Sequence, residues 1–129
     1  MKLKLKIINL DGIYLDKEVD LVNITIATGN VTILANHIPL ISSIPISLMY
    51  IKDEGIKTTY AISGGTLFVD EKECKIITNA IESSDEIDFE RALKSKQRAE
   101  ERLALHSDDI DYHRAEVSLQ RALNRLRLQ

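Results

Sequence analysis

The sequence contains one cysteine, no tryptophan and few aromatic residues. A single cysteine excludes an internal disulfide and indicates a reducing compartment. Aromatic residues make up 5% of the chain and hydrophobic residues 44%, so a core must be built from Ile, Leu and Val. No apolar run approaches the ~20 residues that span a bilayer, and the N-terminus lacks the apolar segment of a signal peptide. The composition predicts a soluble protein, or a soluble subunit of a larger assembly.

Arginine is absent from the first 87 residues, and glycine and proline are absent after Gly65. All seven arginines lie in the last third of the chain, whereas eight of the ten lysines precede residue 88. Residues 1–87 carry a net charge of −4 and residues 88–129 a net charge of +1. Such a balance gives no general attraction to nucleic acid, and no basic patch interleaves with aromatic residues. The segregation matters because only arginine offers a planar fork for carboxylate or phosphate.

The first two thirds of the chain alternate apolar and polar residues with a period of two. Leu3, Leu5 and Ile7 alternate with lysines, and a similar alternation begins at Val22. This period is typical of strands with one buried face. Turn signals follow at Asp11-Gly12, Thr28-Gly29-Asn30, Asp53-Glu54-Gly55 and Gly64-Gly65. We expect about eight to ten short strands in an antiparallel sandwich or barrel, with Pro39 and Pro45 outside central ladder positions.

The period changes after residue 87. Small and apolar residues now recur at helical spacing, first at Ala92, Ser95, Ala99 and Leu103. A second set follows at Ala115, Leu119, Ala122 and Leu126. We expect two helices, at about 88–105 and 110–127, joined by the segment HSDD. The first can be capped by Ser83 with Glu86, or by Asp88, and the second by Asp108 or Asp109. Because the seam of the first helix is built from small residues, the hairpin buries little area and is a candidate moving part.

Nothing in the sequence indicates a catalytic centre. His37, His106 and His113 are far apart, and none has a cysteine or carboxylate at the spacing of a metal site. Cys74 occupies an apolar strand position, which favours a buried structural thiol over a nucleophile. Gly64-Gly65 is not part of a phosphate-binding loop, because the motif G-x-x-x-x-G-K-[ST] is missing.

The arginines therefore carry the functional argument. Arg91 and Arg98 share one face of the first helix, ~10 Å apart, and Arg121 and Arg125 share a face of the second. If the two faces meet, four guanidinium groups converge, and an anion such as a nucleoside triphosphate would offset their repulsion. The alternative is an ordinary charged surface with local pairs such as Glu90–Lys94.

Several segments resemble the epsilon subunit of the bacterial F-type ATP synthase, over essentially the whole chain. The segment IDFERA, residues 87–92, is similar to the family motif (I/L)D-x-x-R-A, and SGGTLFV, residues 63–69, is similar to a glycine motif of its sandwich. The segment NHIPL, residues 36–40, stands where the family has GHAPL. The resemblance implies an N-terminal β-sandwich at 1–83 and a C-terminal α-helical hairpin at 84–129.

The resemblance also implies a role. The sandwich would dock the gamma subunit and the c ring, and the subunit would couple proton-driven rotation to ATP synthesis without being an enzyme. The hairpin would regulate the complex, inhibiting ATP hydrolysis when extended toward the catalytic alpha/beta head. The resemblance places the protein on the cytoplasmic face of the bacterial membrane, as a peripheral subunit without bilayer insertion, nucleic-acid partner or metal.

In several bacterial members ATP binds the folded hairpin as a regulatory ligand. Carried over by motif, Ile87 and Asp88 would meet the adenine, and Arg91 and Arg98 would reach toward ribose and phosphate. The phosphate clamp would be completed by Arg121 and Arg125, with Glu82 as an acidic residue just before the motif.

The partner-docking loop implied by the resemblance contains Asn30, His37 and Pro39. It departs from the family pattern GELGILPGH, because here it reads GNVTILANH, residues 29–37. Asn36 replaces a glycine and can still adopt a positive φ, whereas Thr32, also in place of a glycine, is harder to accommodate.

Two other classes of function remain open. A free-standing nucleotide sensor would keep the arginines but would need no exposed apolar patch on the sandwich. A dimerisation module would pair its alanine and leucine seams between chains and would be indifferent to ATP.

Overall fold

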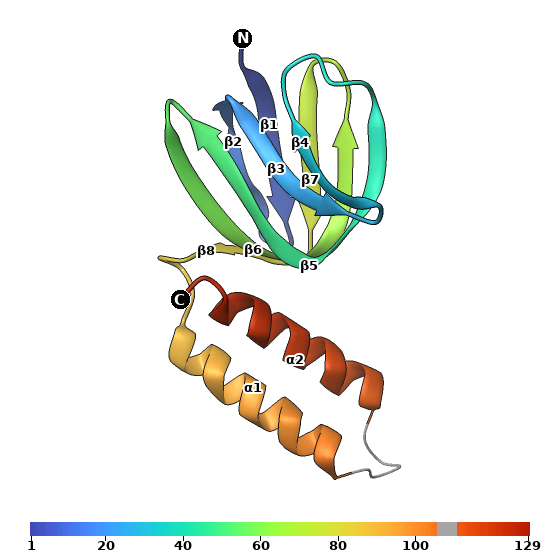
Figure 1. Cartoon of the computed structure of the whole chain (residues 1–129), viewed down its shortest axis with the longest axis vertical. Helices are drawn as coiled ribbons and strands as arrows, with labels where there is room; N and C mark the ends of the chain where they lie inside the picture. The colour runs from blue at the N-terminus through green and yellow to red at the C-terminus, as the bar shows by residue number, and fades with distance from the viewer. Residues whose placement is uncertain (106–110) are drawn as a thin grey trace. The chain divides into compact units, whose positions relative to one another are not determined.

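A computed structural model describes residues 1–105 and 111–129, which form eight strands and two helices (Figure 1). The strands are β1 (Leu3–Asn9), β2 (Gly12–Val19), β3 (Leu21–Ile26), β4 (Gly29–Ile33), β5 (Leu40–Asp53), β6 (Ile56–Val69), β7 (Glu73–Thr78) and β8 (Ile81–Ser83). The helices are α1 (Phe89–Ala104) and α2 (Tyr112–Leu126). The chain divides into two compact units, Met1–Ser83 and Ser84–Gln129, and each is described by itself.

The first unit confirms the predicted β-sandwich. Its strands follow the order β2-β1-β7-β6-β5-β3-β4, and β8 pairs with β6. Every pairing is antiparallel except that of β1 with β7, which is parallel. The strands β5 and β6 have 14 residues each, longer than the short strands that we expected, and they curve through the unit as one long hairpin (Figure 1).

The alternating pattern explains the core. In β1 the side chains of Leu3, Leu5 and Ile7 are buried, as are Val22 and Ile24 of β3. The intervening lysines of β1 are exposed or half-buried. The rest of the core is aliphatic apart from Met49, Cys74 and Tyr60, as the shortage of aromatic residues predicts.

The predicted turn at Gly64-Gly65 is wrong, because both glycines lie inside β6. The ladder between β5 and β6 keeps one register from Leu40↔Val69 to Asp53↔Ile56, and the position where Pro45 faces Gly64 is missing from it. Proline cannot donate to the ladder, so the missing pair lies where we expected. The signal was misread because glycine also serves where backbones approach closely inside a sheet. A Cβ on Gly65 would lie 2.1 Å from the carbonyl oxygen of Ile77 in β7.

The turn between β5 and β6 is formed by Glu54 and Gly55, with φ of 51° and 80°. Two central residues with positive φ are typical of the tight turns that match the twist of a hairpin. The backbone N–H of Glu54 donates to Oδ2 of Asp20 at 2.8 Å, which ties the turn to the start of β3. The predicted turn at Asp53-Glu54-Gly55 is confirmed.

The second unit is the predicted helical hairpin, with helix ends within two residues of those expected. Asp88 caps α1, accepting a hydrogen bond from the backbone N–H of Arg91, so Asp88 is correct and Ser83 is not. The prediction for α2 is wrong, because Asp111 is its cap and accepts from the N–H of Arg114. The caps that we expected, Asp108 and Asp109, lie outside the described residues, as do the rest of the connecting segment and His106.

Candidate functional site

The two helices of the hairpin pack through a seam of buried alanines: Ala92 and Ala99 from α1, and Ala115 and Ala122 from α2. The helices lie side by side and run in opposite directions (Figure 1). Alanine lets the two backbones approach closely but buries little apolar area, so the seam holds the helices only weakly. The predicted seam of small residues is confirmed.

An arginine directly precedes each seam alanine: Arg91, Arg98, Arg114 and Arg121. One residue corresponds to a rotation of 100° about the helix axis, so each arginine lies to the same side of its own seam. Because antiparallel helices are related by a twofold rotation, both rows reach the same side of the hairpin. We call this surface the arginine flank, and it also includes Arg102 and Arg125, one turn after Arg98 and Arg121, respectively.

The positions along the hairpin divide the arginine flank into two groups. On each helix the two seam alanines are seven residues apart. Ala99 of α1 and Ala115 of α2 lie nearer the connection between the helices. The other pair therefore lies at the open end, and with it Arg91, Arg121 and Arg125. Arg98 lies two turns from Arg91, ~10 Å toward the connection. The four arginines that we expected to converge thus share one flank, but three lie near one end and Arg98 lies apart.

Few protein groups neutralise these arginines. In the described part of the chain, Arg91, Arg98 and Arg121 form no ion pair with a carboxylate, and Nε of Arg121 is buried without a hydrogen-bond partner. Arg98 donates to the hydroxyl of Ser95 at 3.4 Å. The local pair Glu90–Lys94, given above as part of the alternative, does not form among the described residues, and α1 instead has an ion pair between Lys96 and Glu100 at 3.7 Å. A guanidinium donor without a partner, such as Nε of Arg121, fits a phosphate oxygen.

The remaining residues of the expected nucleotide site lie in different settings. Ile87 is buried, and the carboxylate of Asp88 is used as the cap of α1. Glu82 belongs to the sandwich unit, where it lies in β8 opposite Ala61 of β6. The structure thus gives Asp88 a local structural role that the sequence alone left open.

A groove of about 580 Å³ lies on the sandwich unit between the ends of β5, β6 and β7. Its lining is mainly apolar and includes three charged residues: Pro39, Leu40, Ile41, Phe68, Val69, Asp70, Glu73 and Lys75. Ile41, which lines the groove, is 72% exposed, and Ile38, which precedes Pro39 in the chain, is 76% exposed. Contiguous exposed apolar residues rimmed by charge are typical of protein-interaction sites.

The expected docking loop borders this groove. Pro39 lines it, and Nδ1 of His37 lies 2.7 Å from the carbonyl oxygen of Ile38. Asn36 has φ 62°, so it adopts the conformation that its family glycine would supply. Thr32 causes no strain, because it lies in β4 and its hydroxyl accepts a hydrogen bond from Asn23.

Asn30 also lies in β4, outside the turn that we placed it in, which is formed by the two residues before Gly29. Its side-chain amide exchanges two hydrogen bonds with the amide of Asn23 on β3, at 2.8 and 2.9 Å. The pair satisfies polar groups on the exposed face of the two strands without charge. Asn30 therefore replaces the acid of the family pattern with a neutral, fixed amide.

Other chemistry receives no support in the part of the chain that the structure describes. No cluster of three metal-ligating side chains is present there. Burial raises the pKa of the Cys74 thiol to about 12, with a smaller contribution from the charge of Glu73, which suits a structural thiol. Of the described helices, neither is long and apolar enough to cross a membrane.

The chain is thus a two-unit protein, with a β-sandwich followed by a helical hairpin that carries arginines along one flank. Residues 2–84 match the β-sandwich domain of the ATP synthase delta/epsilon chain, and residues 85–128 match its long α-helix domain. The chain belongs to this family, as the resemblance implied.

Individual relatives agree with this assignment. The ATP synthase epsilon chain of Bacillus licheniformis is 39% identical over 78% of this chain and 77% of its own length. That of Mycoplasmopsis pulmonis is 42% identical over 71% and 67%, respectively. A chain in a cryo-EM structure of the Euglena gracilis mitochondrial ATP synthase has the same fold, with a TM-score of 0.84 and 22% identity, covering 98% of this chain and 79% of that one.

Proposed function

We propose that this chain is a non-catalytic central-stalk subunit of an F-type ATP synthase, with a nucleotide-sensing hairpin. Its sandwich docks the gamma subunit and the c ring, so that it turns with the rotor during ATP synthesis. Its place is the cytoplasmic face of the bacterial membrane, held there by its partners. The observation that carries the proposal is family membership over both units, 2–84 and 85–128.

The exposed apolar groove of the sandwich favours a stalk subunit over a free-standing nucleotide sensor. A sensor needs no such surface, whereas a subunit covered by partners leaves one when it is isolated. Ile38, Ile41 and Pro39 are the residues that a partner would cover, and the charged residues Lys75 and Glu73 also line the groove. An apolar centre with a charged edge is the usual composition of a protein interface.

The docking proposal is tested by binding the purified chain to a gamma subunit–c ring complex. Ile41→Asp should abolish or strongly weaken binding, because it buries an unpaired charge in the contact. Ile56→Asp is the matched control, since Ile56 is equally exposed, 70% against 72%, but lies beside the β5–β6 turn, far along the hairpin from the groove. Equal binding by wild type and Ile41→Asp would place the docking surface elsewhere.

The arginine flank supports a regulatory ATP site. The triphosphate would lie at the open end of the hairpin, bound by Arg91, Arg121 and Arg125, with Arg98 reaching its far side. The adenine would lie toward Ile87 and Asp88, and the family motif adds Glu82 as an acidic residue. Nε of Arg121, which has no partner among the described residues, is a donor suited to a phosphate oxygen.

The regulatory logic follows from linkage. A ligand that binds only the closed hairpin stabilises it by RT ln(1 + [ATP]/Kd), so the ATP concentration sets the fraction of closed hairpin. When ATP is scarce the helices are released toward the catalytic alpha/beta head, where they inhibit ATP hydrolysis. ATP acts here as a ligand and not as a substrate.

Isothermal titration calorimetry of the chain with ATP tests this site. Arg91→Ala, Arg121→Ala and Arg125→Ala should each weaken binding by about 10- to 150-fold, the worth of a hydrogen bond to a charged group. Arg127→Ala is the matched control, because it removes the same charge from the other side of α2, where Arg127 donates to Asn124. No saturable heat would refute the site, and equal weakening by Arg127→Ala would show only general attraction between charges.

A further inference from the structure

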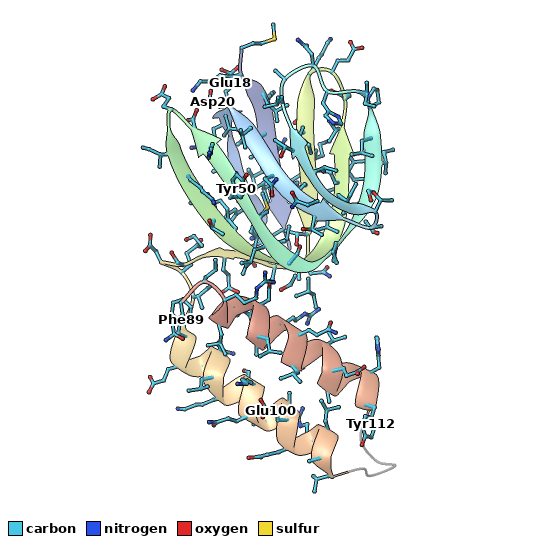
Figure 2. The ribbon with its side chains drawn as sticks, viewed as in Figure 1. Glu18, Asp20, Tyr50, Phe89, Glu100 and Tyr112 are labelled. Atoms are coloured by element: carbon cyan, nitrogen blue, oxygen red, sulfur yellow. The ribbon has the colours of Figure 1, made fainter. Side chains whose placement is uncertain are left out.

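The hairpin has a cross-helix hydrogen bond at its connected end. The hydroxyl of Tyr112 donates to the backbone carbonyl of Leu103 at 2.9 Å. Tyr112 is the first residue of α2, and Leu103 lies in the last turn of α1. Figure 2 shows Tyr112 at the end of the hairpin opposite to Phe89, where α1 begins. The bond therefore joins the two helices at the end remote from Arg91, Arg121 and Arg125.

The carbonyl that accepts this bond is one that helix geometry leaves without a partner. The last four carbonyls of a helix have no donor four residues further on within the helix. Leu103 belongs to this group, because α1 ends at Ala104. The neighbouring carbonyl of Arg102 accepts from the N–H of Leu105 at 3.3 Å, so the two carbonyls are satisfied in different ways. Of these two bonds, the one to Leu103 comes from the other helix.

The weak seam makes this bond important for the whole hairpin. Four alanines supply little burial, and the arginines at the open end repel one another across it. Helices of 16 and 15 residues are marginal when isolated, so separation of the two also exposes each to melting. A cross-helix bond that is lost on separation raises the closed fraction directly.

We infer that Tyr112 is a positioning residue for the arginine flank: its hydroxyl holds α2 against α1 through the Leu103 carbonyl. The arginines of α2 then lie beside those of α1, on the same side of the hairpin, in the nucleotide-free protein. The bond is independent of any ligand, and only its consequence for ATP rests on the proposed function. An intact bond raises the fraction of protein that is competent to bind, which removes part of the cost of binding.

Native-state amide hydrogen exchange of the full chain tests the inference, with Tyr112→Phe as the variant. The change removes one oxygen and keeps the ring. Exchange at Ala99 and Ala122 should become about two- to twelve-fold faster, the range expected for one lost hydrogen bond. Ala122 is the decisive probe, because it lies about 15 Å along α2 from Tyr112. Tyr50→Phe is the control, since that ring contacts Lys57 in the sandwich unit.

A hydroxyl that only orders its own helix end would accelerate exchange near Ala115 and leave Ala122 unchanged, and that result overturns the inference. Unchanged exchange throughout α1 and α2 overturns it as well. Saturating ATP should slow exchange at Ala122 in both proteins. If ATP slows neither, but Tyr112→Phe still accelerates Ala122, the positioning role is upheld and the proposed nucleotide site fails.

Discussion

Gly65→Ala should strongly destabilise the sandwich unit. Gly65 has φ +140°, a conformation that side-chain-bearing residues rarely adopt, and its new Cβ would lie 2.1 Å from the Ile77 carbonyl oxygen and 2.8 Å from the Thr78 Cα. Both obstacles are backbone atoms of β7, so a side-chain rotation cannot relieve them. The backbone strain costs about 1–3 kcal/mol, and the forced separation of the strands about 1–3 kcal/mol more.

Gly55→Ala is the matched control for this prediction. Gly55 also has a positive φ, +80°, but a Cβ there would meet nothing within 4 Å. Its substitution should cost only the backbone term, about 1–2 kcal/mol. The difference between the two variants therefore isolates the close approach of β6 to β7.

Urea unfolding of the full chain measures this difference. Tyrosine fluorescence reports mainly on the sandwich, because Tyr14, Tyr50 and Tyr60 lie in it and only Tyr112 lies in the hairpin. The free energy of unfolding of such a unit is about 4–12 kcal/mol, so Gly65→Ala removes a large part of it. If the two alanine variants agree within about 0.5 kcal/mol, the close approach contributes nothing and the reasoning is refuted.

Three further predictions concern single groups. The Cys74 thiol should resist alkylation at pH 8 in the native protein and react only after unfolding, because burial raises its pKa to about 12; rapid native labelling by a maleimide would contradict this. The backbone N–H groups of Lys72 and then Glu73 donate to the Asp70 carboxylate and lower the pKa of Asp70. Ionised Asp70 therefore stabilises the fold at a pH above the pKa of Asp70 in the unfolded chain. This stabilisation is lost as the pH falls through the lower pKa of Asp70 in the folded protein. Asp70→Asn should therefore lower the urea midpoint at pH 7, and this difference from the wild type should shrink as the pH falls below the ordinary Asp pKa. Asp111→Ala should reduce the stability of the hairpin by about 0.5–2 kcal/mol through loss of the cap, which far-UV circular dichroism on heating would detect as earlier helix melting than in Asp111→Asn.

The sequence predicted the two units because period and burial are local properties. Alternation at Leu3, Leu5 and Ile7 needs only one apolar face, and the helical spacing of the alanines needs only one seam. Gly64-Gly65 was misassigned because its cause is not local. The carbonyl of Ile77 excludes a Cβ at Gly65, and that contact exists only after β6 and β7 pair. The same limit applies to the parallel pairing of β1 with β7, which joins distant segments.

The prediction of the N-cap of α2 was wrong for a different reason. Asp108, Asp109 and Asp111 all have the side chain that an N-cap requires, and local propensity alone hardly separates them. The choice depends on where α2 begins relative to its buried face, and that is set by the packing of Ala115. Helix ends are the least certain part of any pattern-based prediction for this reason.

The candidate nucleotide site shows how far a repeated pattern can lead. Four arginine–alanine pairs, spaced by seven residues within each helix, contain four of the arginines of the arginine flank. The spacing fixes the face of each helix, but not which arginines share an end. That required the antiparallel order of the helices, which places Arg91, and not Arg98, level with Arg121 and Arg125. Tyr112 was not recognised as important, because its partner is a backbone carbonyl and has no sequence signature.

The separation of lysine from arginine agrees with the roles proposed for the two units. The sandwich has a large aliphatic core and needs cations only for a solvated surface, which lysine provides through a strongly hydrated ammonium group. The hairpin has a thin alanine seam and repelling arginines along one flank, so its closed state is held by small terms. An anion that binds several planar guanidinium groups at once would offset their repulsion through charge-assisted hydrogen bonds. A hairpin with a larger core would be more stable and, for that reason, less responsive to such a ligand.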